Sequence, residues 1–110
     1  MTGKVLVLGP TGVVGTAVTQ LLQQGDDFQV ITAGRRAVRS ARHLRVDLLD
    51  RAATARAFTE LSDVTHLVYA AYSERATMSE TGAVNLAMLR HALDALEQVG
   101  APLDRVVLIG

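Results

Sequence analysis

Gly9-Pro10-Thr11-Gly12-Val13-Val14-Gly15 is the stretch of sequence that decides the fold of this 110-residue chain. It follows an apolar run at residues 5–8 and leads directly into a segment with the spacing of an amphipathic helix. A strand, a glycine turn and a helix together form an anion-binding arrangement, because the first helical turn offers unpaired N–H groups and the positive end of the dipole. Three glycines at these positions make a tight turn, admit a pyrophosphate and let the helix pack closely on the strand.

The spacing of this loop is G-x-x-G-x-x-G, which differs from the commoner G-x-G-x-x-G fingerprint. A phosphate loop of the G-K-[ST] type is excluded, because Thr16 and not lysine follows Gly15. The plainer alternative is a tight strand-to-helix turn with no ligand. Because the strand and the helix are both present, we predict a dinucleotide-binding loop that includes Gly9 and Gly15.

Composition excludes several classes of protein. Apolar residues make up 49% and charged residues 20% of the chain, and the formal net charge is zero, so we expect one globular domain with no nucleic-acid or membrane partner. No cysteine is present, which excludes disulfides and thiolate chemistry, and the three histidines show no ligand-like spacing, so we predict no metal. Residues 1–4 leave no room for a signal peptide before the first strand, and the expected location is cytoplasmic.

Strand-like and helix-like segments alternate along the chain. Strands are expected at 4–8, 28–33, 43–47, 65–71 and 105–109, and helices from 13 to a stop at Gly25, over 51–61 and over 79–99. This alternation predicts an α/β fold with a doubly wound parallel (Rossmann) sheet, its five strands in the order 3-2-1-4-5.

The last expected strand has no polar alternation at residues 106–109, which is typical of a strand covered on both faces. No later segment of the 110 residues covers it. We therefore expect residues 1–110 to be the N-terminal NAD(P)-binding domain of a larger fold, truncated before the rest.

The end of the second strand indicates which cofactor is bound. Enzymes selective for NAD place an acidic residue about 20 positions after the glycines, where it accepts from the ribose hydroxyl. Here Arg35 stands 20 positions after Gly15, and Arg36 follows it. Guanidinium groups bind a 2′-phosphate through charge-assisted bonds, so NADP(H) is favoured over NAD(H). The alternative is a solvated arginine pair in a loop.

Further candidates follow the third and fourth strands. Asp47 has a carboxylate that can accept from the adenine amino group beside Leu48, or it is simply a turn residue. Ala70 and Ala71 are small enough to let the ribose and pyrophosphate of the cofactor lie close to the chain, or they serve only close packing. Tyr72 would lie beside the nicotinamide.

The glycine loop resembles the T-G-x-x-G loop of extended and atypical short-chain dehydrogenases/reductases, and residues 85–95 resemble their N-x-x-x-x-x-x-x-L-x-A helix. Residues 34–36 (G-R-R) and 63–69 (D-V-T-H-L-V-Y) are similar to segments of the progesterone 5β-reductase/iridoid synthase-like group. The resemblance implies NADPH-dependent reduction of an enone or carbonyl of a small-molecule substrate. It also implies cofactor contacts from Thr11, Gly12, Val13, Val14, Arg35, Arg36, Asp47, Leu48, Ala70, Ala71 and Tyr72, with Asn85 as a support residue.

The resemblance further implies a catalytic tyrosine and a lysine that lowers its pKa and holds the ribose, so that an oxyanion is stabilised during hydride transfer; in this group the lysine follows a glycine turn after the fifth strand. Lys4 is the single lysine, and Ser73 and Ala76 stand four residues after Tyr69 and Tyr72. We therefore expect no catalytic residue in this chain. Two alternatives stay open, namely a non-catalytic NADP-binding sensor and an NAD-dependent sugar epimerase or dehydratase, which Arg35 and Arg36 disfavour.

Overall fold

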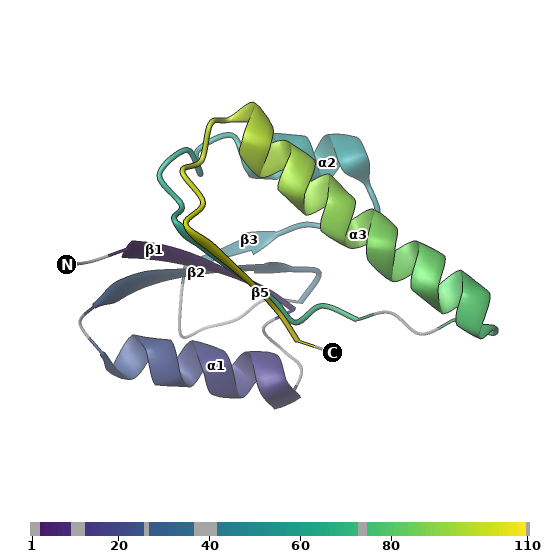
Figure 1. The fold of residues 1–110 in the computed structure, drawn as a ribbon, viewed down its shortest axis with the longest axis horizontal. Helices are drawn as coiled ribbons and strands as arrows, with labels where there is room; N and C mark the ends of the chain where they lie inside the picture. The colour runs from purple at the N-terminus through teal and green to yellow at the C-terminus, as the bar shows by residue number, and fades with distance from the viewer. Residues whose placement is uncertain (1–2, 10–12, 26, 37–41, 73–74, 110) are drawn as a thin grey trace.

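The fold is a five-stranded, wholly parallel sheet with helices on both faces, seen in a computed structural model of the chain (Figure 1). The structure describes residues 3–9, 13–25, 27–36, 42–72 and 75–109. Its elements are β1 (Gly3–Leu8), α1 (Val13–Gln24), β2 (Phe28–Gly34), β3 (Arg42–Arg45), α2 (Arg51–Ala57), β4 (His66–Tyr69), α3 (Met78–Gln98) and β5 (Arg105–Leu108). The strand order is β3-β2-β1-β4-β5, which confirms the predicted doubly wound topology.

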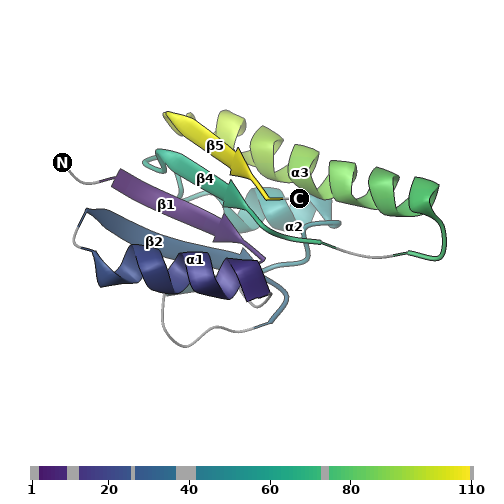
Figure 2. The same cartoon turned by 60° about the horizontal axis from the view of Figure 1, so that its bottom comes forward.

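Two apolar layers hold the helices to the sheet. Figure 2 shows α1 on one face and α2 with α3 on the other. Because side chains alternate along a strand, Leu6 and Leu8 of β1 pack in the cluster under α2 and α3, whereas Val5 and Val7 pack with Val18 of α1. The central strand is therefore buried on both faces, as its uninterrupted apolar sequence predicts.

Several predicted element bounds need correction. The helix expected over 51–61 begins as predicted, with the Asp50 carboxylate accepting from the Ala53 N–H at 2.9 Å, but it ends at Ala57. Phe58 and Leu61 are fully buried from the turn that follows, where the Leu61 N–H donates to the Phe58 carbonyl at 3.0 Å. The third and fourth strands are shorter than expected, and Asp47 lies in a turn and not at a strand end.

The expectation that no later segment covers β5 agrees with its exposure. Val106 is 42%, Val107 44% and Leu108 60% exposed. Because consecutive side chains of a strand point to opposite faces, both faces of this outermost strand are partly uncovered by the described residues.

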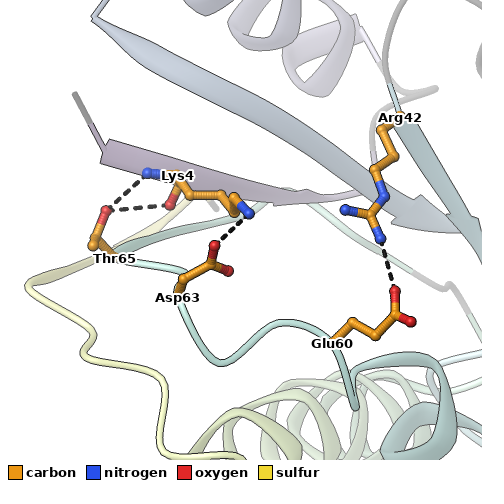
Figure 3. A network of polar contacts seen from close by, with 5 residues as sticks. All are labelled: Lys4, Arg42, Glu60, Asp63 and Thr65. Carbon is orange, nitrogen blue, oxygen red and sulfur yellow. Dashed lines mark hydrogen bonds and ion pairs between the residues drawn. The ribbon is translucent and has the colours of Figure 1, made fainter.

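Polar contacts fasten the amino end of the sheet (Figure 3). The Lys4 Nζ donates to the Asp63 carboxylate at 2.5 Å, and this hydrogen bond is the main cause that lowers the pKa of Asp63 below its usual range. The Lys4 backbone N–H donates to Thr65 Oγ1 at 3.1 Å, and Thr65 Oγ1 is 3.3 Å from the Lys4 carbonyl. A second ion pair joins Arg42 to Glu60 at 3.1 Å. The single lysine is thus held at the amino end of the sheet, opposite the end where the glycine loop begins.

Gly9 marks the carboxyl end of β1 and tolerates no side chain there. Its φ is +78°, in the left-handed region that favours glycine. A Cβ on Gly9 would lie 2.5 Å from both the Cα and the N of Ala71, closer than any real contact. The first glycine of the loop is therefore required by the close approach of β1 to the segment after β4.

Replacing Gly9 with alanine is expected to destabilise the fold by at least about 2 kcal/mol, because the left-handed conformation and the clash with the Ala71 backbone both oppose the new methyl group. Urea unfolding followed by circular dichroism measures the loss. Gly82→Ala is the matched control, since Gly82 is exposed within α3 and an added Cβ meets nothing within 4 Å. That variant should gain about 0.5–1 kcal/mol. Equal stability of the two variants would contradict the packing described for Gly9.

Candidate functional site

A cavity opens at the carboxyl ends of the parallel strands, where ligands bind in open α/β sheets. Its volume is about 240 Å³. Seven of the residues predicted from sequence line it: Gly9, Arg35, Arg36, Asp47, Leu48, Ala71 and Tyr72. The ends of β1, β2 and β4 and the turn after β3 thus converge on one site.

The remaining predicted residues are not among those lining the cavity. Gly15 is buried within α1, Val14 is 48% exposed on that helix, and the Ala70 N–H donates to the Leu8 carbonyl at 2.9 Å. Thr11, Gly12 and the side chain of Val13 lie outside the described part of the structure. The predicted pyrophosphate contacts of this loop stay predictions.

Four lining residues were not singled out from the sequence as site residues: Gly34, Val46, Leu49 and Met88. Met88 lies one helical turn after Asn85 on α3 and is 7% exposed, so its pattern is that of an ordinary core residue. Val46 and Leu49 stand directly before and after the predicted pair Asp47 and Leu48. This position in the sequence is the feature that could have indicated them as lining residues. They give the cavity an apolar wall beside its charged rim.

The charged rim is made by Arg35 and Arg36. Both side chains are exposed, and neither makes an ion pair with any residue that the structure describes. Arg42, by contrast, is paired with Glu60. Two uncompensated guanidinium groups at the edge of a cavity attract an anion, and their planar donors suit phosphate oxygens.

The turn after β3 forms the opposite wall. One oxygen of the Asp47 carboxylate accepts from the Leu49 N–H at 3.0 Å, so the alternative reading of Asp47 as a turn residue is confirmed. The same residue also lines the cavity, and the adenine contact stays a prediction. From α3, the Nδ1–H of His91 donates to the Leu48 carbonyl at 2.8 Å, which fixes this turn against the helix.

Tyr69 and Asn85 connect β4 to α3. The Tyr69 hydroxyl donates to the Asn85 backbone carbonyl at 3.2 Å, and Nδ2 of Asn85 donates to the Thr81 carbonyl at 2.7 Å. Tyr69 is 7% exposed, and burial raises the pKa of its phenol to about 12. Burial thus favours the neutral, protonated form of this phenol.

Other kinds of site find no support in the described ranges. No group of three or more histidine, aspartate or glutamate side chains is placed to hold a metal ion in residues 3–9, 13–25, 27–36, 42–72 and 75–109. His43, His66 and His91 are each engaged in hydrogen bonds within the fold. In the same ranges, no helix combines the length and apolar character needed to cross a bilayer.

Comparison with known proteins places the chain in a family. Residues 5–110 match the model of the NAD dependent epimerase/dehydratase family, and the chain belongs to this family. A relative from Camptotheca acuminata, (S)-8-oxocitronellyl enol synthase, is 30% identical over 94% of this chain and 29% of its own length. The 3-oxo-Delta(4,5)-steroid 5-beta-reductase of Arabidopsis thaliana is 29% identical over the same shares of each. The chain thus spans less than a third of the curated relatives that it matches.

Solved structures agree on the fold. A short-chain dehydrogenase/reductase superfamily protein from Agrobacterium tumefaciens, with bound NAD, superposes with a TM-score of 0.74 at 24% identity, over 96% of this chain and 31% of that one. The UDP-glucose 4-epimerase of Thermus thermophilus in complex with NAD gives a TM-score of 0.69 at 31% identity, over 89% and 35% of the two chains. The predicted resemblance to short-chain dehydrogenases/reductases is confirmed.

Ultraviolet titration should distinguish the two tyrosines. Because burial raises the Tyr69 pKa from 10.0 in the unfolded chain to about 12, the folded state is favoured below pH 10, and this contribution is lost as the pH rises through about 12. We expect Tyr69→Phe to remove the phenolate absorbance that appears near pH 12. Tyr72→Phe is the control, since Tyr72 is 70% exposed, and it should leave that late phase intact. Loss of the late phase in Tyr72→Phe alone would overturn the assignment.

Proposed function

We propose that this chain binds NADP(H) as the cofactor-binding part of an oxidoreductase of the short-chain dehydrogenase/reductase type. The observation that carries the proposal is the position of the exposed guanidinium groups of Arg35 and Arg36 at the rim of the cavity, where neither makes an ion pair with a described residue. An NAD-selective site requires a carboxylate at the end of the second strand, and two cations occupy that place.

The shape and chemistry of the cavity suit one half of a dinucleotide. Its volume of about 240 Å³ lies just below the range of about 300–1,000 Å³ typical of whole-ligand pockets, so it suits the adenosine end. The apolar side chains of Val46, Leu48 and Met88 form a surface for a flat ring. On this assignment the 2′-phosphate lies by Arg35 and Arg36, and the pyrophosphate lies toward Gly9 and the start of α1.

The proposed reaction of the whole protein is reduction of an enone or carbonyl of a small molecule, for which NADPH supplies the hydride. Support comes from two relatives, one of which is named as a steroid 5-beta-reductase that acts on a 3-oxo-Delta(4,5) substrate. Within this chain, Lys4 is the single lysine and pairs with Asp63 at the end of the sheet opposite the cavity, so it is not placed to pair with Tyr69 or Tyr72. We therefore propose that these 110 residues bind the cofactor but do not turn over a substrate.

An NAD-dependent sugar-nucleotide epimerase is the second candidate. It is favoured by the family match and by the likeness to the UDP-glucose 4-epimerase of Thermus thermophilus. The two candidates differ in the cofactor that they select, so a binding measurement separates them.

Calorimetric titration of the chain with NADPH and with NADH is the test. We expect NADPH to bind more tightly, and the double variant Arg35→Gln/Arg36→Gln to lose about 10–100-fold in NADPH affinity, because charge-assisted bonds contribute about 1.5–3 kcal/mol. NADH affinity should change little. Arg56→Gln/Arg90→Gln removes the same number of charges from two exposed arginines, on α2 and α3, that do not line the cavity, and is the charge-matched control.

Tighter binding of NADH by the unmodified chain would reject the NADP(H) assignment and favour the epimerase candidate. An equal loss of affinity for both cofactors in the double variant would show that the arginines do not read the 2′-phosphate.

A further inference from the structure

The outermost strand on the cofactor side, β3, carries a third arginine to the same edge of the sheet. Its register with β2 sets His43 beside Thr32 and Arg45 beside Gly34. Neighbouring strands lie about 4.8 Å apart, so Arg45 is adjacent in space to the residue that precedes Arg35. The Val46 N–H donates to the Gly34 carbonyl at 3.1 Å, which holds the end of β3 at this position.

The side chain of Arg45 lies on the face of the sheet that α1 covers. His43 reaches Thr32, and Thr32 alternates with Ile31 and Ala33, which face the α2–α3 core. Because side chains two residues apart share a face, Arg45 lies on the same face as His43. The N-terminus of α1, where the proposed pyrophosphate site begins, is on that face. Arg45 is in register with Gly34 and directly precedes Val46, which both line the cavity, although Arg45 is not itself among the lining residues.

The side chain of Arg45 is exposed and forms no ion pair with the described part of the chain. Arg42, on the same strand, pairs with Glu60 and is in register with Ile31, farther from the cavity. The two arginines of β3 therefore differ. Arg42 forms an ion pair within the fold, whereas Arg45 forms none with the described residues.

His43 fixes the geometry of this strand end. One ring nitrogen, Nε2, donates to the Gly34 carbonyl at 3.1 Å, and in the neutral ring Nδ1 then accepts from the Thr32 hydroxyl at 2.7 Å. The ring thereby bridges two alternate residues of β2. A register slip of one residue would move Arg45 to the opposite face, and these two bonds oppose it.

We propose that Arg45 is a third guanidinium of the 2′-phosphate subsite and that His43 is its positioning residue. This inference rests on the proposed NADP(H) binding. A 2′-phosphate carries a charge of about −1.5 to −2 and three acceptor oxygens, which three guanidinium groups satisfy better than two.

Arg45→Gln and the control Arg42→Gln, each titrated with NADPH and NADH by calorimetry, test the role of Arg45. We expect Arg45→Gln to weaken NADPH binding by about 3–10-fold, as for a partly exposed charged hydrogen bond, and to leave NADH binding unchanged. Arg45→Lys should restore part of the loss, since it keeps the charge without the planar fork. Arg42→Gln should change neither affinity.

His43→Ala tests the positioning role through coupling. It should weaken NADPH binding but not NADH binding, and the double variant His43→Ala/Arg45→Gln should bind NADPH no more weakly than Arg45→Gln alone. A purely structural role of His43 would lower thermal stability and affect both cofactors alike.

The outcomes distinguish this inference from the proposed function. If the unmodified chain prefers NADPH and the Arg35/Arg36 double variant removes that preference, but Arg45→Gln does not alter it, the role of Arg45 is overturned and the proposed function stands. Full additivity of the His43 and Arg45 losses would overturn the positioning role. No preference for NADPH in the unmodified chain would reject both the proposed function and this inference.

Discussion

The contact between Gly9 and the backbone of Ala71 is the constraint on which the site depends. Gly9 also donates its N–H to the Ala33 carbonyl at 3.2 Å, while the Ala70 N–H bonds the Leu8 carbonyl. The ends of β2, β1 and β4 therefore meet at one backbone position with a left-handed conformation. The cavity-lining residues at the ends of these strands, such as Arg35 and Ala71, are positioned by these backbone contacts. A side chain at position 9 would disturb the contacts and with them the shape of the cavity.

The two ends of the sheet use polar groups in different ways. At the amino end, Lys4, Asp63 and Thr65 satisfy one another and hold β1 to the segment that enters β4. Every buried side-chain nitrogen or oxygen in the described residues has a hydrogen-bond partner. At the carboxyl end, Asp47 and His91 also bond within the fold, whereas Arg35 and Arg36 are exposed and make no ion pair with the described residues.

The sequence predicted the topology well because the fold follows from short-range patterns. Short strands of four to seven residues, most of them apolar, that alternate with helices admit few arrangements, and the glycine loop selects among them. The positions of Arg35, Asp47 and Ala71 at the site followed from one rule, that the carboxyl ends of parallel strands share an edge.

What the sequence did not predict depends on distances across the fold. The spacing of Phe58 and Leu61 suits a helical face, yet the same spacing serves a turn that buries both residues beyond the end of α2. Met88 has the sequence pattern of a buried core residue. That it also lines the cavity depends on where α3 lies relative to the strand ends, which the pattern does not show. The apolar sequence of Val106 and Leu108 permits burial, but in the described residues no element covers these side chains fully.

The pairing of the first strand with the fourth has a consequence for folding during synthesis. The hydrogen bonds between Lys4 and Thr65 span 61 positions. At about 5–20 residues per second, the ribosome needs roughly 3–12 s to deliver the second partner after the first. During that interval β1 can pair with β2, whereas its other edge has no strand to pair with until β4 has been synthesised. The central strand of the finished sheet therefore has one unpaired edge until β4 has been synthesised, and its pairing with β4 closes a longer loop than its pairing with β2.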